Sequence, residues 1–158
     1  MTLKINLNTE IINNLDLVSA KEQIVSVLQD KNIANYEQKL QFEIDYQLEE
    51  NDPRELSEVP QIRLWFVRLD AAYPWLPFLL DWKTGELARY AAMLVPHQFS
   101  RGEGIIYNPE ALEIWVMNKI FILAEWLQQQ EIPARSRLKS LAQIFGYELD
   151  DRFFDLFI

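Results

Sequence analysis

Alternation of apolar and polar residues predicts two strands in the first third of the chain. Residues Leu3–Asn8 (LKINLN) alternate as a half-buried strand does. Residues Leu40–Leu48 (LQFEIDYQL) alternate more regularly, with every second side chain apolar. Between them, the SAKE sequence at Ser19–Glu22 matches a capping box and predicts a helix that runs to about Lys31. This part of the chain therefore predicts strand, helix and strand.

Apolar residues at helical spacing predict three further helices, over residues 60–72, 109–130 and 133–145. Each begins at a proline, which a first helical turn tolerates because no intrahelical amide bond is lost there. Asn108 is a good N-cap for the second helix, and Gly146 is a typical stop for the third. The second helix carries apolar residues on more than one stripe, so we expect it to be long, central and buried.

The segment between the first and second of these helices is less regular. Trp75–Asp81 is apolar and held by two prolines, which predicts a short helical turn or a wall of the core. Ala88–Val95 fits a helix or a strand. We favour a strand, paired as a hairpin with Ile105–Tyr107 across a glycine-containing loop. The sequence thus predicts a single α+β domain over residues 1–158, helix-rich, with a small sheet and a long central helix near residues 109–130.

Composition excludes several kinds of chemistry. The 158 residues include no cysteine, so disulfides, iron–sulfur clusters, zinc thiolate sites and cysteine nucleophiles are excluded. His97 is the only histidine, which argues against zinc and non-haem iron sites and leaves one residue as the base of any Ser-His-Asp triad. The carboxylate pairs Glu49/Glu50 and Asp150/Asp151 are adjacent in sequence, so the two side chains of each pair point apart on regular structure. They therefore give no support for catalysis by paired carboxylates. We therefore expect no catalytic residue, no metal site and no cofactor.

Charge is unevenly distributed along the chain. The net charge is −9 at pH 7, and most of it lies in the first 59 residues, with the highest density in FEIDYQLEENDPRELSE (residues 42–58). Such a balance opposes nonspecific binding to nucleic acid or anionic lipid. The acidic segment is a solvated face or a patch that steers a basic partner toward the protein. Residues 111–127 are the most apolar long stretch, but three charges within it favour a core helix over a membrane span.

Stiff aromatic side chains concentrate in YPWLPFLLDWKTGELARY, residues 73–90. A core, a ligand pocket and a docking surface are all compatible with this composition. Tryptophan and tyrosine anchor many protein interfaces, and here they alternate with charged residues. Packing in the core and exposure at an interface remain alternatives at this point.

A long motif in this region resembles the chlororespiratory reduction six family of cyanobacteria and chloroplasts. The motif reads DPRELSEVPQIRLWFVRLDAAYPWLPFLLDWKTGELARYAAMLVPHQFS over residues 52–100. The stretches NPEALEIWVMNKIFILAEWL and SRLKSLAQIFGYELDD continue the resemblance, which covers roughly residues 38–155.

The resemblance implies a role in assembly. Plant members of that family are needed to build the hydrophilic arm of the photosynthetic NAD(P)H dehydrogenase-like complex, and they act on its iron–sulfur subunit NdhI without belonging to the finished complex. The N-terminal sequence does not read as a signal or transit peptide, so the chain looks like a cyanobacterial, cytoplasmic member. The resemblance carries over no catalytic residue.

We expect the client surface to include the charged and aromatic members of this motif. The candidates are Arg54, Glu55, Trp75, Asp81, Trp82, Glu86, Arg89 and His97. A second hypothesis is a ligand-binding protein or small enzyme with a pocket around His97, Arg89 and Tyr90. A third is an interaction module of another photosynthetic complex. Partners expected under the first hypothesis are the NdhI-type subunit or an early subcomplex of the hydrophilic arm, in transient association with the thylakoid-bound complex.

Overall fold

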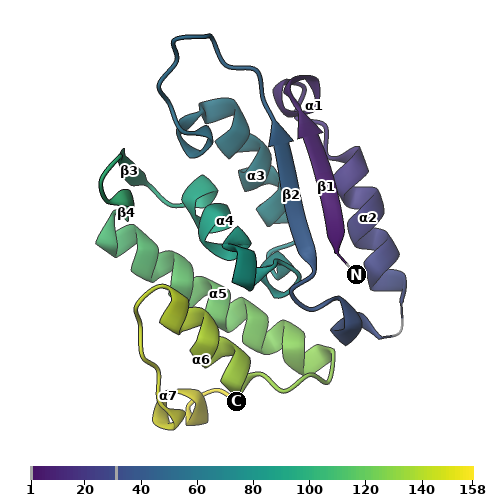
Figure 1. The fold of residues 1–158 in the computed structure, drawn as a ribbon. Coiled ribbons are helices and arrows are strands. Elements are labelled where there is room, and N and C mark those ends of the chain that lie inside the picture. Colours follow the sequence, from purple (N-terminus) through teal and green to yellow (C-terminus); the bar gives the residue numbers. More distant parts are fainter. Residues whose placement is uncertain (1, 31) are drawn as a thin grey trace.

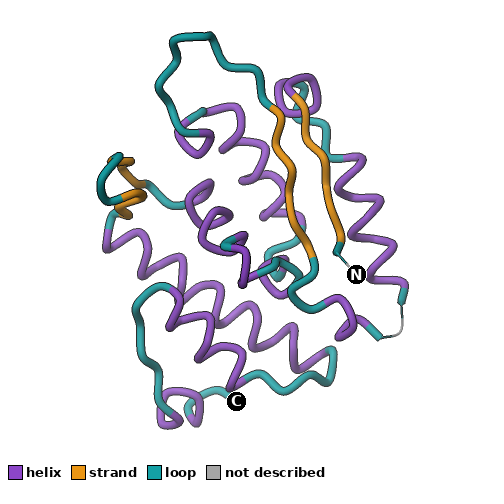
Figure 2. Tube along the Cα trace, in the orientation of Figure 1, coloured by secondary structure: helices purple, strands orange, loops and turns teal. Residues whose placement is uncertain are grey.

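A computed structural model describes residues 2–30 and 32–158 and shows a helix-rich α+β fold, as predicted (Figures 1 and 2). The α-helices are α1 (Thr9–Asn13), α2 (Val18–Gln29), α3 (Pro60–Ala72), α4 (Glu86–Leu94), α5 (Pro109–Gln129), α6 (Arg135–Ile144) and α7 (Asp151–Asp155). The strands are β1 (Leu3–Asn8), β2 (Leu40–Asp45), β3 (His97–Ser100) and β4 (Gly104–Tyr107). Short 3₁₀ turns are η1 (Ile33–Tyr36), η2 (Leu56–Glu58), η3 (Leu76–Phe78) and η4 (Trp82–Thr84).

The first unit of the fold is a parallel pair of strands. β1 and β2 pair in register from Leu3 opposite Leu40 to Asn8 opposite Asp45. Parallel strands need a long crossover, and α2 supplies it beside β1, while α3 and α4 lie beside β2 (Figure 1). Alternate side chains such as Ile5 and Phe42 are buried in the core. Their neighbours face solvent, which accounts for the alternation in the sequence.

The capping box predicted at Ser19 does not form. The helix begins one residue earlier, at Val18, whose backbone N–H donates to Asp16 Oδ1 at 2.9 Å. Ser19 is therefore the second residue of the helix and cannot act as its N-cap, and the N-cap residue, Leu17, makes no side-chain capping bond. The helix ends at Gln29, and the predicted end at Lys31 lies outside the described residues.

The strand predicted at Ala88–Val95 is wrong, because this segment belongs to α4. Leu87, Tyr90 and Ala91 are buried at helical spacing against the core, a period that a strand cannot present. The hairpin exists, but its strands are β3 and β4, which pair from His97 opposite Tyr107 to Ser100 opposite Gly104. Ile105–Tyr107 thus pairs with the nearer segment His97–Ser100, which the prediction had placed in the connecting loop.

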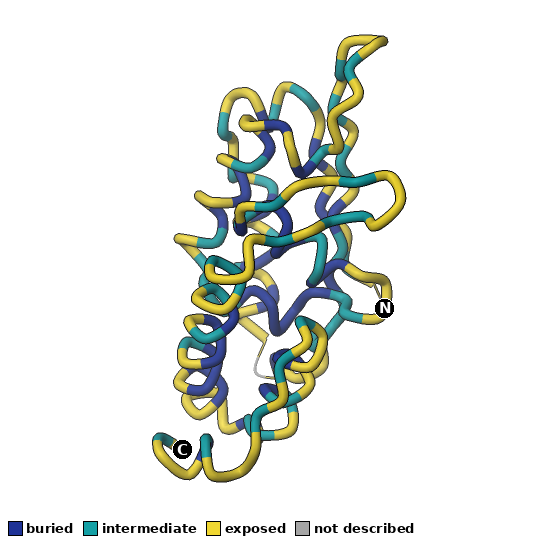
Figure 3. Tube along the Cα trace, turned by 90° about the vertical axis from the view of Figure 1, so that its left-hand side faces the viewer, coloured by how far each residue is buried: buried dark blue, intermediate teal, exposed yellow. Residues whose placement is uncertain are grey.

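Other predicted boundaries hold closely. α3 and α5 have the predicted extents, and Asn108 Oδ1 accepts from the N–H of Ala111 as the expected N-cap. α6 begins two residues later than predicted, at Arg135. α5 is not buried all round, because Ile114 on its outer side is 70% exposed. Buried positions follow the inner sides of the helices, whereas the connections are mostly exposed (Figure 3).

A buried polar cluster ties three helices together. Lys119 of α5 is 3% exposed, and its Nζ donates to Asp70 Oδ1 of α3 at 2.6 Å and to the carbonyl of Pro74 at 2.8 Å. Tyr90 of α4 donates to the same Asp70 oxygen at 2.8 Å. Burial lowers the pKa of Lys119, although Asp70 opposes this shift. The cluster therefore depends on Asp70 to offset the cost of removing an ammonium group from water.

Replacing the two charges singly is expected to have unequal effects. Asp70→Asn leaves Lys119 buried without its counter-charge and should lower the free energy of unfolding by about 3 kcal/mol. Lys119→Met should cost less, because the Asp70 side chain is 22% exposed and can be hydrated. Urea denaturation of both variants beside the wild type measures the difference. A larger loss for Lys119→Met would contradict this account of the cluster.

Candidate functional site

A cleft of about 350 Å³ lies where three separate parts of the chain meet. Its walls come from η2, from β4 of the hairpin, and from α4. The lining residues are Glu55, Leu56, Ser57, Gly85, Ala88, Arg89, Ala92, Met93 and Ile105. Two charged pieces of the motif described above, residues 52–58 and 85–99, thus come together in space although α3 separates them in sequence.

The α4 wall of the cleft is made largely of small residues with one cation. Gly85, Ala88 and Ala92 leave room along the helix, and Gly85 has a φ of 84°, a conformation that favours glycine. Arg89 projects from this wall and donates through Nη2 to the carbonyl of Phe42 on β2 at 2.8 Å. Its other terminal nitrogen lies 3.6 Å from Glu86 Oε1. Arg89 therefore fixes the position of α4 against the sheet while it lines the cleft.

Glu86 lies behind this wall and is 8% exposed. Its Oε2 accepts a long hydrogen bond, 3.4 Å, from the backbone N–H of Phe42. Burial raises the pKa of Glu86, and the neighbouring Arg89 partly offsets this shift. Glu86 and Arg89 together bind the N–H and C=O of one residue of β2, much as a neighbouring strand would.

His97 lies behind Ser57 and connects the hairpin to the rest of the protein. Its Nε2 is 3.0 Å from Ser57 Oγ, and its Nδ1 is 3.0 Å from the carbonyl of Val95. Arg63 donates to the carbonyls of Ser57 and Ala92 at 2.9 and 2.8 Å. The same Nδ1 lies 3.2 Å from Arg63 Nη1, which only donates, so the Val95 carbonyl and the Arg63 guanidinium compete for this ring nitrogen. Burial of Arg63 lowers its pKa.

The bond between Ser57 and His97 resembles the first contact of a catalytic triad, but its surroundings differ. A backbone carbonyl, rather than a carboxylate, orients the ring. Ser57 is 4% exposed, which limits the access of a substrate to its hydroxyl. The arrangement joins η2, α3 and β3 and acts chiefly as a structural tie.

The two remaining charged candidates near the cleft lie at its edge. Glu55 lines the cleft and is exposed. Arg54 is exposed and makes a two-pronged pair with Asp52, through Nε at 3.0 Å and Nη2 at 2.7 Å. This side-chain bond lowers the pKa of Asp52. Four of the eight predicted residues therefore line the cleft or lie directly behind its walls, namely Glu55, Glu86, Arg89 and His97, and Arg54 is adjacent to Glu55 in sequence.

The two tryptophan candidates do not reach this cleft. Trp75 is half-buried and stacks on Trp126 with ring centroids 4.6 Å apart and planes 4° apart. Trp82 is half-buried too, and its Nε1 donates to the carbonyl of Pro77 at 2.8 Å. Both rings are engaged in intramolecular packing, with one edge accessible. Their part in a client surface stays a prediction.

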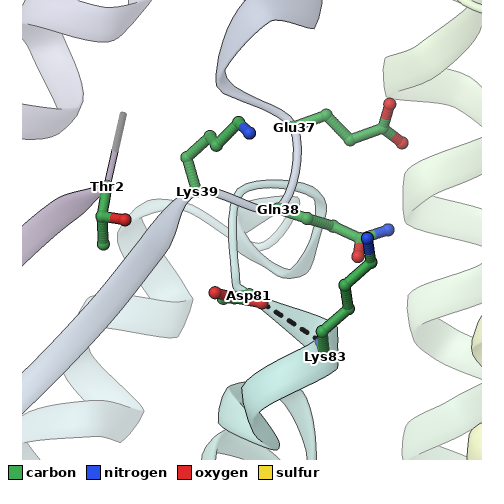
Figure 4. Close-up of a pocket in the computed structure, with 6 residues that line it drawn as sticks. All are labelled: Thr2, Glu37, Gln38, Lys39, Asp81 and Lys83. Atoms are coloured by element: carbon green, nitrogen blue, oxygen red, sulfur yellow. Dashed lines mark hydrogen bonds between the residues drawn. The ribbon is translucent and has the colours of Figure 1, made fainter.

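Asp81 lies in a separate hollow of about 390 Å³ that Figure 4 shows in close-up. Its Oδ1 accepts from the backbone N–H of Lys83 at 3.1 Å, and its Oδ2 accepts from Gln41 Nε2 at 3.0 Å. The carboxylates of Glu37 and Asp81 point away from each other (Figure 4). These contacts give Asp81 a structural role as the cap of η4, and the hollow is the weaker candidate for a site.

The pocket predicted around His97, Arg89 and Tyr90 forms only in part. Arg89 lines the cleft and His97 lies behind Ser57. Tyr90 is 2% exposed on the core side of α4, where it binds Asp70. The expected convergence of the three side chains therefore does not occur, because successive residues on a helix point in different directions.

Several lining residues escaped the sequence prediction. Ser57 was not among the predicted site residues, and the small residues of α4 carried no role because a strand was expected there. Small residues at positions 85, 88 and 92 share one side of a helix, so a helix prediction would have revealed the wall. Ile105 completes the cleft only through the fold of the hairpin.

The described residues contain neither a membrane-spanning helix nor a cluster of metal-ligating side chains. Within residues 2–30 and 32–158, each helix is too short or too polar to cross a bilayer. Over the same ranges, three or more His, Asp or Glu side chains nowhere gather as they would to hold a metal ion.

Comparison with known protein families gives a match over most of the chain. The sequence model of a family described as chlororespiratory reduction 6 matches residues 7–156. The match includes every element from the end of β1 to α7, and with them the whole cleft. No solved structure matches the chain significantly.

Tyr107 holds the hairpin wall of the cleft to α4, which gives a prediction in alkaline solution. Its hydroxyl donates to the carbonyl of Ala88 at 2.8 Å, and burial raises its pKa to about 12. Tyr107→Phe loses this bond and should be less stable than the wild type by about 1 kcal/mol at pH 7. A raised folded-state pKa gives stability that is complete below pH 10 and is lost as the pH rises through 12.

The difference in free energy of unfolding between the wild type and Tyr107→Phe should therefore decrease as the pH rises from 10 to 12. Chemical denaturation at several pH values measures it, and the other tyrosines and lysines cancel because both proteins contain them. A gap that stays constant over this range would show that Tyr107 is not held as the structure has it.

Proposed function

This chain belongs to the chlororespiratory reduction 6 family, and from that premise we propose that it is a non-enzymatic assembly factor that binds the NdhI-type iron–sulfur subunit. Membership of the family supports a role in assembly of the NAD(P)H dehydrogenase-like complex. The client is that subunit or an early subcomplex of the hydrophilic arm. The protein acts in the cytoplasm, as one domain, and associates only transiently with the membrane-bound complex.

The cleft is the observation that carries the choice of surface. It brings together the charged ends of the family-like motif, and its walls carry both signs of charge through Glu55 and Arg89. The small side chains of Gly85, Ala88 and Ala92 leave space along α4, and this elongated space suits a polypeptide segment better than a compact cofactor. Mixed charge at the rim of an interface favours fast, specific and reversible encounters.

The overall charge fits the same role. An assembly factor must release its client, so modest affinity with electrostatic steering is more useful than a large apolar interface. The net charge of −9 provides long-range attraction for a client with a basic surface. Without cysteine, the chain supplies no thiolates for a cluster and acts through binding alone.

A second candidate function rests on the hydrogen bond between Ser57 and His97. Its distance of 3.0 Å falls in the range of a nucleophile and its base. Burial of Ser57 and the carbonyl that orients the ring weigh against this function. The two candidate functions are distinguished by the variants below.

Affinity capture of the tagged protein tests the client. At low salt we expect enrichment of the NdhI-type subunit from a cyanobacterial lysate, and a lower yield at moderate salt because the encounter is electrostatic. Glu55→Lys should reduce the yield roughly tenfold through repulsion at the cleft. Glu148→Lys makes the same charge change on an exposed residue outside the lining of the cleft and should have little effect. Equal capture by both variants would reject the cleft as the client surface.

Removal of the serine hydroxyl tests the enzyme alternative. Ser57→Ala loses one hydrogen bond and should lower the free energy of unfolding by about 1 kcal/mol. Cells that contain normal amounts of this variant should assemble normal amounts of the complex. Loss of the complex with an undiminished level of folded variant would instead favour a chemical role for Ser57 and His97.

A further inference from the structure

The backbone groups on the outer edge of β2 have hydrogen-bond partners in the first part of the strand but lack them further along. The register places the backbone groups of odd-numbered residues within β2 toward β1. The carbonyl of Lys39, just before the strand, accepts from Leu3, although its N–H donates to Leu79, and the N–H of Gln47, just after the strand, donates to Thr9 Oγ1 at 2.7 Å. Even-numbered residues therefore direct their N–H and C=O groups away from β1, toward the outer edge.

The first part of this edge is satisfied within the chain. The N–H of Leu40 donates to Leu79 at 2.7 Å, and its carbonyl accepts from the N–H of Asp81 at 2.9 Å. At the next outward position, Phe42, two side chains replace a strand: Arg89 binds the carbonyl and Glu86 binds the N–H. The chain thus covers the edge as far as Phe42.

The next outward positions are Ile44, Tyr46 and Leu48. Within the part of the chain that the structure describes, their backbone N–H and C=O groups have no hydrogen-bond partner outside the β1–β2 ladder, which ends at Asp45. The alternating sequence nevertheless continues to Leu48, and all three side chains are half-buried. On its outer side this stretch has no neighbouring strand among the described residues, and beyond Asp45 it has none on its inner side either, because β1 ends at Asn8.

The solvent face of the same stretch is acidic. Asp45 and Glu49 are exposed, and within residues 2–30 and 32–158 neither of them has an ion-pair partner within 4 Å. Glu43 is also exposed but pairs with Lys4 at 2.8 Å. An added strand would therefore meet half-buried apolar side chains on one face and unpaired carboxylates on the other.

We propose that the outer edge of β2 from Ile44 to Leu48 binds an extended client segment that alternates basic and apolar residues. This inference rests on the proposed function, since it states how the client would be held. The segment would pair with the free backbone groups, as in recognition by strand addition. Its lysines or arginines would lie beside Asp45 and Glu49, and its apolar residues beside Tyr46 and Leu48.

The rest of the fold limits where this strand can lie. Glu86 and Arg89 already bind Phe42, so the added strand ends there. Arg89 also lines the cleft, which places the end of the docking edge next to the proposed client surface. One client chain can therefore pair with β2 and continue into the cleft.

Amide hydrogen exchange, followed residue by residue by NMR, tests the proposal. The probe is a short acetylated peptide of alternating lysine and valine, and the control peptide has the same composition with its lysines and valines in separate blocks. The alternating peptide should slow exchange at the amides of Ile44, Tyr46 and Leu48, while the control should not. Protection that is absent, or equal for both peptides, would overturn the proposal.

Charge reversal gives a second measurement on the folded protein. The double variant Asp45→Lys with Glu49→Lys should weaken binding of the alternating peptide roughly tenfold. The matched control, Glu22→Lys with Glu148→Lys, has the same net charge and changes exposed residues away from this edge. Equal weakening by both pairs would indicate nonspecific attraction and would overturn strand addition.

Client capture separates this proposal from the proposed function. If the wild type captures the NdhI-type subunit and the Asp45→Lys, Glu49→Lys variant captures it equally well, the docking edge is wrong and the assembly role stands. If the wild type captures no subunit of the complex while the alternating peptide still protects the edge, the proposed function fails and the edge remains a strand-binding site.

Discussion

The arrangement of this protein depends on how the backbone N–H and C=O groups at the outer edge of its two-stranded parallel sheet find hydrogen-bond partners. Each strand of such a pair has one neighbour, so half of its backbone groups need partners from elsewhere. The chain covers the first part of β2 with the segment that ends at Asp81 and the next part with Glu86 and Arg89. These contacts fix the start of α4, and α4 in turn positions one wall of the cleft (Figure 1).

Two separate clusters of polar side chains stabilise the core and the walls of the cleft. Asp70, Tyr90 and Lys119 form a buried cluster on the core side of α4. Ser57, Arg63 and His97 join the hairpin to η2 and α3 around the cleft. Most charged groups that the sequence suggested as functional therefore form hydrogen bonds or ion pairs within the protein and stabilise its fold. Glu55 is exposed but caps η2 with its side chain, so the exposed acids after β2, Asp45 and Glu49, are the groups most available to a partner.

The sequence predicted those elements that rely on local chemistry. Alternation located β1 and β2, and Asn108 with Pro109 located the start of α5, since caps and periodicity act over a few residues. Ala88–Val95 could not be assigned in the same way, because the contacts that make it a helix come from α3 and β2. The cleft depends on that helix and on the hairpin partner, so only some of its residues were found. Trp75 and Asp81 were proposed as an aromatic and a charged member of the family-like motif, and the structure places both in intramolecular contacts.

Site-specific photo-crosslinking tests most directly whether the cleft binds the client. A crosslinking residue in place of Ile105 would lie in the cleft, and one in place of Ser140 would lie on the exposed side of α6. We predict that the first position, and not the second, forms crosslinks in cells to the NdhI-type subunit of the hydrophilic arm. Crosslinks to that subunit from Ser140 alone, or to unrelated proteins from Ile105, would contradict the account.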